Sequence, residues 1–478
     1  MFQARGTQKL MKLTKMRAVS VGLVAVVPIV LTACLPAATY SVSGNKILMP
    51  DGVTRFVPYG YVVECMSFTS SIPAAGLCNA STSSPERNGN NQSGSNQVTW
   101  AAHSKANTIR FQVAPANLFN TTGAQTTDSC GTVNTAFLTL MDGLVNQATT
   151  DHMVAIVTDQ EENSTQTAGP MAVDQSFWGY TACHYAGQKV FFDLFNEPYK
   201  LRTFSPSVPT DLTDAWTCWR SASTTTPCAD GKTYVSMQTL ADTVRTYANN
   251  IIVAEGVFQD QNLSDWRSGV DQGLPAHLLT GSNIAYGIEP DLFNSQSGGG
   301  KLGLSGDGSG TDRNAAQWAM RFGTLAATYP IMPEAFVNYY GGHCDPYGFT
   351  GINTSTKDST PGGTGTVPFA NTFDANPNAK TNTVGDVSAL ADYLYNNSIG
   401  FILYSQDPGT SPLWAASGPS TSYTSNTNWG GTDTASGQVW DYVNCSVYAN
   451  APGTINPQTV FGQGALFAYV MYSWSLPQ

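Results

Sequence analysis

The chain has 478 residues, with 22 basic and 33 acidic side chains and a formal net charge of −11. The first 33 residues hold five of the basic groups and none of the acidic ones, so the remainder carries 17 basic against 33 acidic groups, a net charge of −16. This acidic balance excludes nucleic acid and an anionic membrane surface as expected partners. Charged residues make up only 12% of the chain, and a surface of neutral polar residues is typical of an exported protein.

The N-terminal segment gives a reason for export. Basic residues at positions 9–17 precede a mostly apolar run over 18–31, and the tetrapeptide Leu-Thr-Ala-Cys ends at Cys34. The run is too short for a comfortable transmembrane helix and is typical of a signal peptide. Because Leu-Thr-Ala-Cys resembles a bacterial lipobox, residues 1–33 are predicted to be a lipoprotein-type signal peptide and Cys34 a lipid anchor, the one expected link to a membrane. Cleavage near Ala38 without lipid is the alternative. Either way the mature chain is expected outside the cell or at its surface.

Short apolar runs after the signal segment predict β-strands. Residues 40–56 have the pattern of a small hairpin that turns at Pro50-Asp51-Gly52. Eight further runs are rich in Val, Ile, Phe or Tyr, and each has the length of a strand. These runs are 56–63, 107–113, 154–159, 190–196, 251–255, 284–288, 331–336 and 401–405.

The spacers between these runs include plausible helices. Residues 236–247 place Met237, Leu240, Val244 and Tyr247 on one face, and residues 312–329 and 387–396 have a similar pattern. Strand and helix alternating eight times predict an α/β fold, the (β/α)8 TIM barrel, with a short N-terminal β-hairpin. Residues 34–478 are expected to form a single catalytic domain and a monomer. Its long polar βα loops are predicted at about 295–311, 341–383 and 416–437.

Nine cysteines fit an exported chain. If Cys34 carries lipid, eight remain and allow up to four disulfides, whose connectivity the sequence leaves open. Cys218 and Cys228 are close enough to close one loop. The chain has no Cys-x-x-Cys and no His-Glu-x-x-His, so we predict no metal site and no cofactor.

Polar residues recur where the predicted strands end. They are Arg110, Gln112, Asp159, Gln160, Glu161, Asn196, Glu197, Glu255, Glu289, Asp291, Glu334, Gln406 and Asp407. Repeated in register, they predict a polar pocket at the carboxyl end of the barrel, where barrel enzymes build their active sites. Glu255 and Glu161, taken singly, are expected to be solvated strand ends.

Glu197 and Glu334 stand out within this set. They close the fourth and seventh predicted strands, which face each other across a barrel mouth. Pro198 ends the strand ladder at Glu197, since proline has no backbone donor. Two facing carboxyl groups are the requirement for glycoside hydrolysis, and a separation of about 5 to 5.5 Å would indicate a retaining reaction.

The motifs around these carboxylates resemble glycoside hydrolase family 5, a cellulase-containing family of retaining (β/α)8 enzymes. The decapeptide Val-Phe-Phe-Asp-Leu-Phe-Asn-Glu-Pro-Tyr over 190–199 resembles the strand-four motif, and the segment over 329–336 resembles the strand-seven motif. The resemblance implies that Glu197 is the acid/base and Glu334 the nucleophile. It also implies that Asn196 binds the sugar 2-hydroxyl and that Arg110 supports the nucleophile. It covers roughly residues 45–410.

Several positions depart from the family pattern. Gln160 stands where a histidine usually follows strand three, and Glu289-Pro290-Asp291 replaces the usual His-x-Tyr after strand six. Tyr404 takes the place of the usual tryptophan platform after strand eight. Acidic residues at 289 and 291 would raise the pKa of neighbouring carboxyl groups by repulsion. The sugar subsite at the cleavage point is therefore expected to be altered.

Aromatic side chains near strand or loop ends are candidate sugar platforms. These candidates are Trp266, Tyr404, Trp414 and Trp429. The other tryptophans singled out are predicted to lie in the core: Trp178, Trp216, Trp219, Trp318 and Trp440.

The sequence therefore predicts a retaining endo-β-glycosidase that hydrolyses an extracellular polysaccharide, with a β-1,4-glucan as the first choice. The altered subsite keeps two alternatives open. One is a cell-surface carbohydrate-binding protein on a catalytically impaired barrel. The other is a hydrolase of a different β-glycan, such as mannan or β-1,3-glucan.

Overall fold

The computed structural model describes the barrel and parts of the chain beyond it. The described residues are 39–67, 98, 101–102, 106–160, 169–198, 213–223, 225, 227–228, 231–257, 263, 273–290, 315–334, 393–403 and four short strands between 432 and 459. The predicted signal segment and lipid anchor lie outside them, as do the loops predicted at 295–311 and 341–383. None of the helices in the described part is long and apolar enough to cross a membrane.

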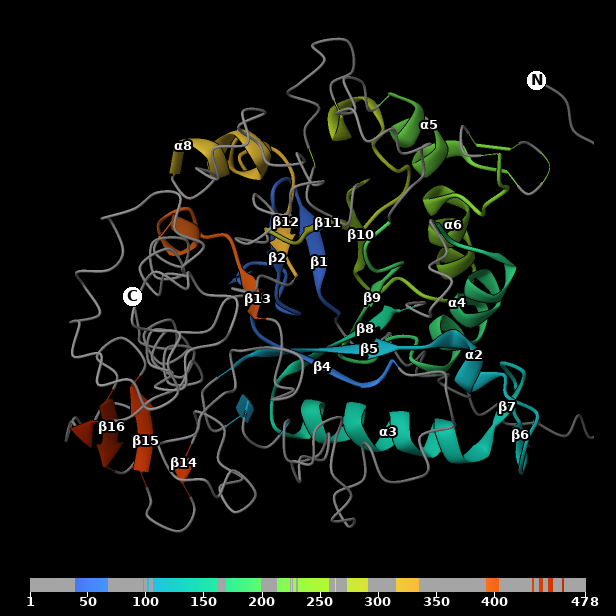
Figure 1. Ribbon diagram of the computed structural model, residues 1–478, viewed down its shortest axis with the longest axis horizontal. Helices are drawn as coiled ribbons and strands as arrows, with labels where there is room; N and C mark the ends of the chain where they lie inside the picture. The colour runs from blue at the N-terminus through green and yellow to red at the C-terminus, as the bar shows by residue number, and fades with distance from the viewer. Residues whose placement is uncertain are drawn as a thin grey trace, which may run out of the picture. The chain divides into compact units, whose positions relative to one another are not determined.

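Eight parallel strands form the central sheet. In spatial order they are β12 (Ile331–Pro333), β11 (Ile284–Ile288), β10 (Ile252–Glu255), β9 (Val190–Asp193), β8 (Val154–Asp159), β5 (Thr108–Val113), β4 (Tyr59–Met66) and β13 (Phe401–Leu403). Every neighbouring pair is parallel, and the two end strands, β12 and β13, approach each other. Figure 1 shows the strands grouped around one axis with helices outside them. The predicted (β/α)8 barrel is confirmed.

The helices of the described residues pack outside the strands. They include α2 (Pro115–Leu118), α3 (Thr135–Thr150), α4 (Ala172–His184), α5 (Thr213–Ser221), α6 (Met237–Tyr247), α8 (Ala315–Trp318), the π-helix η2 (Ala319–Gly323) and α9 (Thr324–Ala326), with a 3-10 turn η1 (Leu274–Ala276). Side chains cap the longer ones: Asn134 accepts a hydrogen bond from the Phe137 N–H at the start of α3, and Ser236 accepts one from the Thr239 N–H at α6.

Two helix predictions need correction. In α6 the side chains of Met237, Leu240 and Val244 are buried, but Tyr247 is 51% exposed and does not join their face. The helix predicted over 312–329 is not one regular helix, because its described part changes from α to π geometry and back. Of the helix predicted over 387–396, residues 393–396 are helical and the rest lie outside the described residues.

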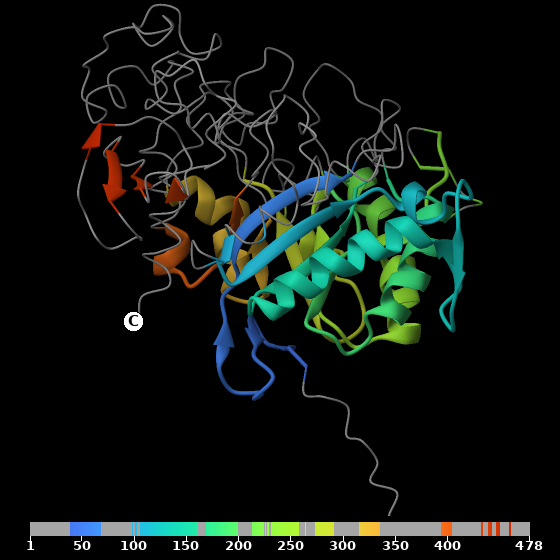
Figure 2. The ribbon, with the colours of Figure 1, turned by 90° about the horizontal axis from the view of Figure 1, so that it is seen from below.

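The N-terminal hairpin has three strands rather than two: β1 (Ser41–Ser43), β2 (Lys46–Leu48) and β3 (Arg55–Phe56). The predicted turn at Pro50–Gly52 joins β2 to β3. Tyr40, Ile47 and Phe56 of this hairpin are buried in one cluster with Phe191 at the start of β9, and the Tyr40 and Phe191 rings lie 5.3 Å apart. The hairpin therefore closes the amino end of the barrel (Figure 2), so a site must use the carboxyl end.

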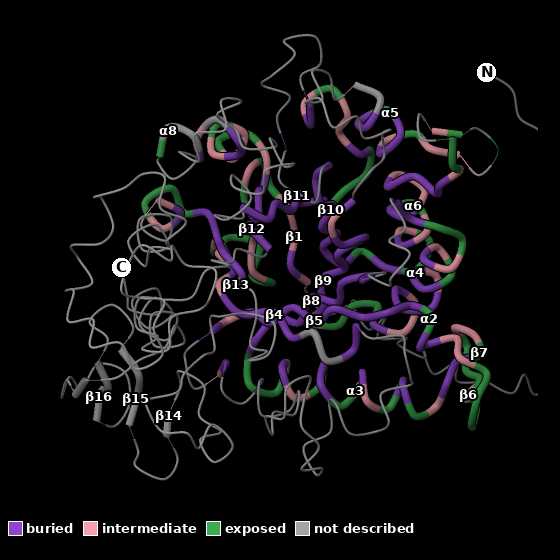
Figure 3. Tube along the Cα trace, in the orientation of Figure 1, coloured by how far each residue is buried: buried purple, intermediate pink, exposed green. Residues whose placement is uncertain are grey.

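Burial divides the barrel into an interior and an outer layer. Alternate strand residues point inward, so Val62, Ile156, Val253 and Met332 fill the interior next to the hairpin. The residues between them pack beneath the helices. Figure 3 shows the described barrel strands as mostly buried and the helices with exposed outer faces. Four tryptophans lie fully buried as predicted: Trp178, Trp216, Trp219 and Trp318. The side chain of Trp440 lies outside the described residues.

Two disulfide bonds cross-link the helical layer outside the barrel strands. The predicted Cys218–Cys228 bond is confirmed, and Cys130 pairs with Cys183. The latter ties the hairpin of β6 (Gln125–Thr127) and β7 (Thr132–Asn134) to α4. The side chains of the remaining five cysteines lie outside the described residues.

The C-terminal part contains structure that the sequence analysis did not anticipate. The strands β14 (Thr432–Asp433), β15 (Gln438–Asp441), β16 (Ser446–Ala449) and β17 (Gln458–Thr459) pair in this order as an antiparallel sheet. The loop predicted over 416–437 is therefore wrong at its end, where β14 lies. The rest of that loop lies outside the described residues.

Candidate active site

A polar layer lies one step beyond the apolar barrel interior. Because side chains on a strand alternate between two faces, the residue two places after an inward-facing apolar residue faces inward too. Asp193 follows Phe191 in this way, Glu255 follows Val253, and Glu334 follows Met332. The corresponding position on β11, two residues after Ala285, is Gly287. These positions lie within one residue of the carboxyl ends of their strands, so the layer forms the floor of the barrel mouth.

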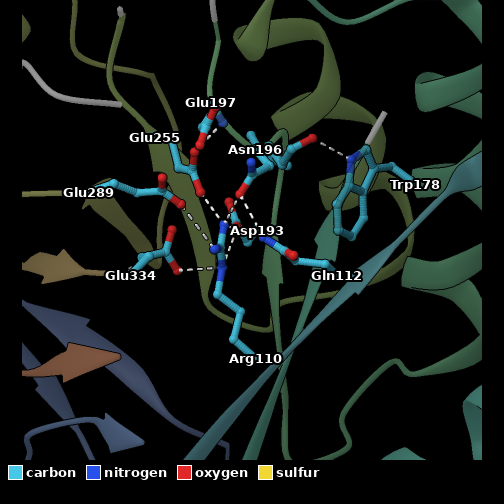
Figure 4. A network of polar contacts seen from close by, with 10 residues as sticks. Arg110, Gln112, Trp178, Asp193, Asn196, Glu197, Glu255, Glu289 and Glu334 are labelled. Carbon is cyan, nitrogen blue, oxygen red and sulfur yellow. Dashed lines mark hydrogen bonds and ion pairs between the residues drawn. The ribbon is translucent and has the colours of Figure 1, made fainter. Parts of the chain in front are cut away.

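Arg110 of β5 is the hub of this layer (Figure 4). Its guanidinium is fully buried and donates to Asp193 Oδ2 from Nη2 at 2.7 Å and from Nε at 3.1 Å. Nη2 also donates to a carboxylate oxygen of Glu255, and Nη1 donates to Glu289 Oε1 at 3.2 Å. A fourth carboxylate, that of Glu334, lies 3.9 Å from Nε. A single buried guanidinium therefore interacts with four buried carboxyl groups.

The electrostatics of Arg110 follow from this arrangement. Burial alone would lower the pKa of the guanidinium, but the negative charges of Asp193, Glu255, Glu334 and Glu289 raise it well above its usual value. The arginine is therefore charged at any accessible pH. Removing it would leave several carboxylates buried without their main counter-charge, which is far more costly than losing an exposed ion pair.

Glu334 is the least solvated of the predicted catalytic residues. Its side chain is fully buried at the end of β12, and its backbone N–H donates to the Ile288 carbonyl at 2.9 Å. Burial raises the pKa of Glu334 well above its usual value, and repulsion from Asp193 and Glu289 adds to the rise. The positive charge of Arg110 and the neighbouring Glu255 carboxyl group oppose it. The net effect disfavours ionisation of Glu334 relative to a carboxyl group in water.

Gly287 makes room for the Glu334 carboxyl group. A Cβ atom on Gly287 would lie 2.4 Å from Glu334 Oε2 and 2.9 Å from Glu255 Cγ. Real Cβ contacts are longer than this, so only glycine lets both side chains occupy their positions. Neither Gly287 nor Asp193 was predicted from the sequence. The alternation of strand residues could have indicated Asp193, since it stands two residues after the inward-facing Phe191. Gly287 has no side chain, so its sequence context gives no such indication.

The Asn196-Glu197 segment follows β9 as predicted. The Asn196 amide oxygen accepts from Arg110 Nη2 at 2.7 Å and from Gln112 Nε2 at 3.4 Å. The backbone N–H of Asn196 donates to the Asp159 carbonyl at 2.8 Å, which extends the ladder with β8 beyond Asp193. Asn196 is thus fixed from both sides, with its side chain tied to the Arg110 network.

Glu197 itself is half-buried and has a left-handed backbone, with φ of +47°. That region is unfavourable for a residue with a Cβ atom, and a following proline restricts the backbone further. Its N–H donates to Glu255 Oε2 at 2.5 Å. The expectation that Glu255 is a solvated strand end is wrong: its side chain is fully buried, and it contacts both Arg110 and the backbone of Glu197. The local sequence around Glu255 does not reveal these contacts, because Arg110 and Glu197 lie far from it along the chain.

The other predicted site residues divide into two groups. Gln160 is buried directly after β8, and its N–H donates to the Val113 carbonyl at 2.8 Å, so it lies at the carboxyl end with the rest. Glu289 follows β11 and joins the network through Arg110. Asp291, Trp266 and Tyr404 lie outside the described residues, as do the following: Glu161, Gln406, Asp407, Trp414 and Trp429.

The acidic cluster raises the question of a metal. Carboxylate oxygens of Asp193, Glu255 and Glu334 lie within 4.8 Å of one another. Arg110 already places its guanidinium against all three. The positive charge that a cation would supply is therefore provided by the chain itself, and we assign no metal to the cluster.

Comparison with solved structures gives the fold a context. The chain matches the crystal structure of the native form of the β-glucanase SdGluc5_26A from Saccharophagus degradans at 15% identity and a TM-score of 0.52, covering 91% of this chain and 93% of that one. The same β-glucanase in complex with cellotetraose matches at 15% identity and a TM-score of 0.50, with the same coverage of 91% and 93%. A hyperthermophilic endocellulase from the archaeon Pyrococcus horikoshii matches at 14% identity and a TM-score of 0.49, covering 79% of this chain and 93% of that one.

No family model and no curated protein matches the amino-acid sequence. At 15% identity the structural likeness establishes the fold. That fold is the one that the resemblance to glycoside hydrolase family 5 implied.

Proposed function

We propose that the chain is a retaining endo-β-glycosidase that hydrolyses an extracellular polysaccharide. The observation that carries the proposal is the shared charged network at the carboxyl end of the barrel, which joins Asn196-Glu197 after β9 to Glu334 after β12 through Arg110 and Glu255. Two carboxyl groups in unlike surroundings, one half-buried and one fully buried, suit the unlike tasks of an acid/base and a nucleophile.

The proposed reaction has two steps. Glu197 protonates the glycosidic oxygen while the ionised carboxylate of Glu334 attacks the anomeric carbon, and the leaving sugar departs. Glu197 then removes a proton from water, which attacks the glycosyl-enzyme ester and restores Glu334. The anomeric configuration is retained. Glu334 must lose its proton before it attacks, so its raised pKa predicts that activity falls as the pH drops through that pKa.

The remaining site residues are assigned to binding. Asn196 would contact the sugar 2-hydroxyl, and Gln160, Glu289 and Asp291 would line the altered subsite. Tyr404 and Trp266 would offer flat faces to sugar rings. A β-1,4-glucan is the substrate we propose first, because the β-glucanase of S. degradans, which shares the fold, was crystallised with cellotetraose.

The proposed location is the cell surface or the medium. The two disulfides support an oxidising compartment. Removal of residues 1–33, lipidation of Cys34 and a monomeric state remain parts of the proposal. Mass spectrometry of the protein from its membrane fraction tests the lipid: a mature chain that begins at an unmodified residue after Cys34 would contradict it.

The test of the activity is a panel of polysaccharides. The purified protein is incubated with β-glucans, mannan and xylan at acidic and neutral pH, and new reducing ends are measured. The wild type should release them from a β-1,4-glucan, and Glu334→Ala should abolish release while the thermal unfolding curve keeps its shape. Glu197→Ala should lose activity on the polysaccharide, whose leaving group needs the acid. On 2,4-dinitrophenyl β-cellobioside, whose leaving group departs without protonation, added azide should restore turnover, because azide attacks the glycosyl-enzyme without a base and forms the glycosyl azide. Full activity of Glu334→Ala would refute the assignment.

A specific observation favours one rival function. Glu289 replaces the histidine expected after strand six and adds negative charge beside Glu334, which would suit a barrel that binds sugars without cleaving them. The same panel separates the two functions. Binding of a glycan without any product across the whole pH range would favour the carbohydrate-binding protein, and product from mannan or β-1,3-glucan alone would change the substrate.

A further inference from the structure

Glu255 connects the two halves of the proposed catalytic apparatus. Figure 4 shows its carboxylate lying between Glu197 and Arg110. One oxygen, Oε2, accepts the Glu197 N–H at 2.5 Å, and the other, Oε1, accepts Arg110 Nη2. Arg110 in turn faces Glu334. A single buried carboxylate therefore contacts the backbone of the proposed acid/base and the guanidinium beside the proposed nucleophile.

The contact with Glu197 falls at a strained point of the chain. Glu197 has φ of +47° and precedes Pro198, an unfavourable combination that persists only where neighbours enforce it. The bond from its N–H to a buried carboxylate is of the strong, charge-assisted kind. It holds the Glu197 backbone in the orientation that sets where the Glu197 side chain leaves the chain.

The structure around Glu255 keeps its carboxylate in place. Its backbone carbonyl accepts the Trp219 indole N–H of α5 at 2.7 Å. It pairs in register with Gly287 of β11, whose missing side chain leaves space for Glu255 Cγ. Both ends of the residue are thus fixed by elements outside the catalytic segment.

We propose that Glu255 is a positioning residue that holds the acid/base Glu197 in its strained conformation and couples it to Arg110 beside the nucleophile. The proposal rests on the function proposed above and deepens it. Glu255 does not touch the substrate in this scheme. Its effect is transmitted through the Glu197 backbone, and so it should be felt most where protonation of the leaving group limits the rate.

Glu255→Gln tests this directly. A glutamine side chain keeps the size of glutamate but has one acceptor oxygen and one NH2 group. Either the Glu197 N–H or the Arg110 N–H must therefore face this NH2 group and lose its hydrogen bond. The loss of one hydrogen bond to a charged group corresponds to about 10- to 100-fold. We expect kcat/KM for 4-methylumbelliferyl β-cellobioside, whose leaving group needs an acid, to fall by that factor. For 2,4-dinitrophenyl β-cellobioside, which departs without protonation, the fall should be less than about fivefold.

The leaving-group comparison separates positioning from a general structural defect. A damaged barrel would lower both rates equally, and that result would overturn the proposal, as would a loss below threefold on both substrates. Asp242→Asn is the matched control, because it removes one negative charge from the exposed face of α6 and should change neither rate. If Glu255→Gln unfolds, Glu255→Asp keeps the charge but is too short to reach both partners, and the same split is expected.

A second readout does not depend on activity. In protein labelled with 15N-glutamate, the Glu197 amide proton is identified by its loss in Glu197→Gln. It should resonate far downfield in the wild type and move upfield in Glu255→Gln. If the wild type cleaves no glycoside but this shift is seen, the proposed function fails while the contact stands. An unshifted Glu197 amide would overturn the positioning role whatever the activity.

Discussion

Gly287→Ala adds one methyl group at the point where two carboxylates meet. The new Cβ atom would lie 2.4 Å from Glu334 Oε2, whereas ordinary van der Waals contact begins at 3.4 Å. The carboxylate must therefore move by about 1 Å, the size of displacement that can cost ~100-fold in rate when a reacting group is misplaced. In free energy this factor is about 2.7 kcal/mol of transition-state stabilisation. The two nearest obstructing atoms, Glu334 Oε2 and Glu255 Cγ, belong to side chains rather than to the backbone, so the barrel itself should accept the alanine.

The assay is kcat on an aryl β-cellobioside, with thermal unfolding measured in parallel. We expect kcat to fall about 100-fold with little change in the unfolding temperature. Gly143→Ala is the matched control: Gly143 lies exposed within α3 with open space around its Cβ position. It should leave kcat unchanged and stabilise the fold by about 0.5–1 kcal/mol, the usual gain from replacing a helical glycine. A kcat for Gly287→Ala within threefold of the wild type would refute the claim that Glu334 acts from this position.

Two predictions concern stability. Because burial raises the pKa of Glu334 in the native state, the contribution of this residue to stability is fully present below the unfolded-state pKa of about 4.3 and is lost as the pH rises through the native-state pKa. Glu334→Gln should therefore unfold at a higher temperature than the wild type at neutral pH, and the difference should vanish near pH 4; an equal difference at both pH values would contradict this. The Cys130–Cys183 disulfide spans 53 residues and Cys218–Cys228 spans 10. Chain-entropy arguments thus give a loss of about 4 kcal/mol for the double serine variant of the first and about 3 kcal/mol for that of the second. Chemical denaturation measures the free energy of unfolding of both variants. A larger loss for the Cys218–Cys228 variant than for the Cys130–Cys183 variant would contradict the prediction.

The barrel could be predicted because its signals are local. The strands β8 and β11 match their predicted bounds of 154–159 and 284–288, since a buried parallel strand is a continuous apolar run with sharp polar ends. The strands at the site are shorter than predicted: β9 ends at Asp193 and β12 at Pro333. Single backbone hydrogen bonds continue beyond those points, from Asn196 N–H to the Asp159 carbonyl and from Glu334 N–H to the Ile288 carbonyl, but the regular strand geometry ends there.

The site was only partly predictable because it is built from contacts between residues that lie far apart in the sequence. Glu197, Glu334 and Arg110 were found from motifs along the chain. Glu255 was misjudged, since nothing in its own neighbourhood reveals that it meets Arg110, 145 residues away. Gly287 matters through the absence of a side chain. The broken helix after 315 likewise depends on tertiary packing, since its amphipathic pattern alone predicts a regular helix.

The most direct test of the central claim is to trap the covalent intermediate. The wild type is incubated with 2,4-dinitrophenyl 2-deoxy-2-fluoro-β-cellobioside, digested and mapped by mass spectrometry. The proposed mechanism predicts one added fluorosugar on the peptide that contains Glu334, and none in Glu334→Gln. A wild type that hydrolyses β-glucan while the label is absent, or is carried by another carboxylate, would contradict the assignment of Glu334 as the nucleophile.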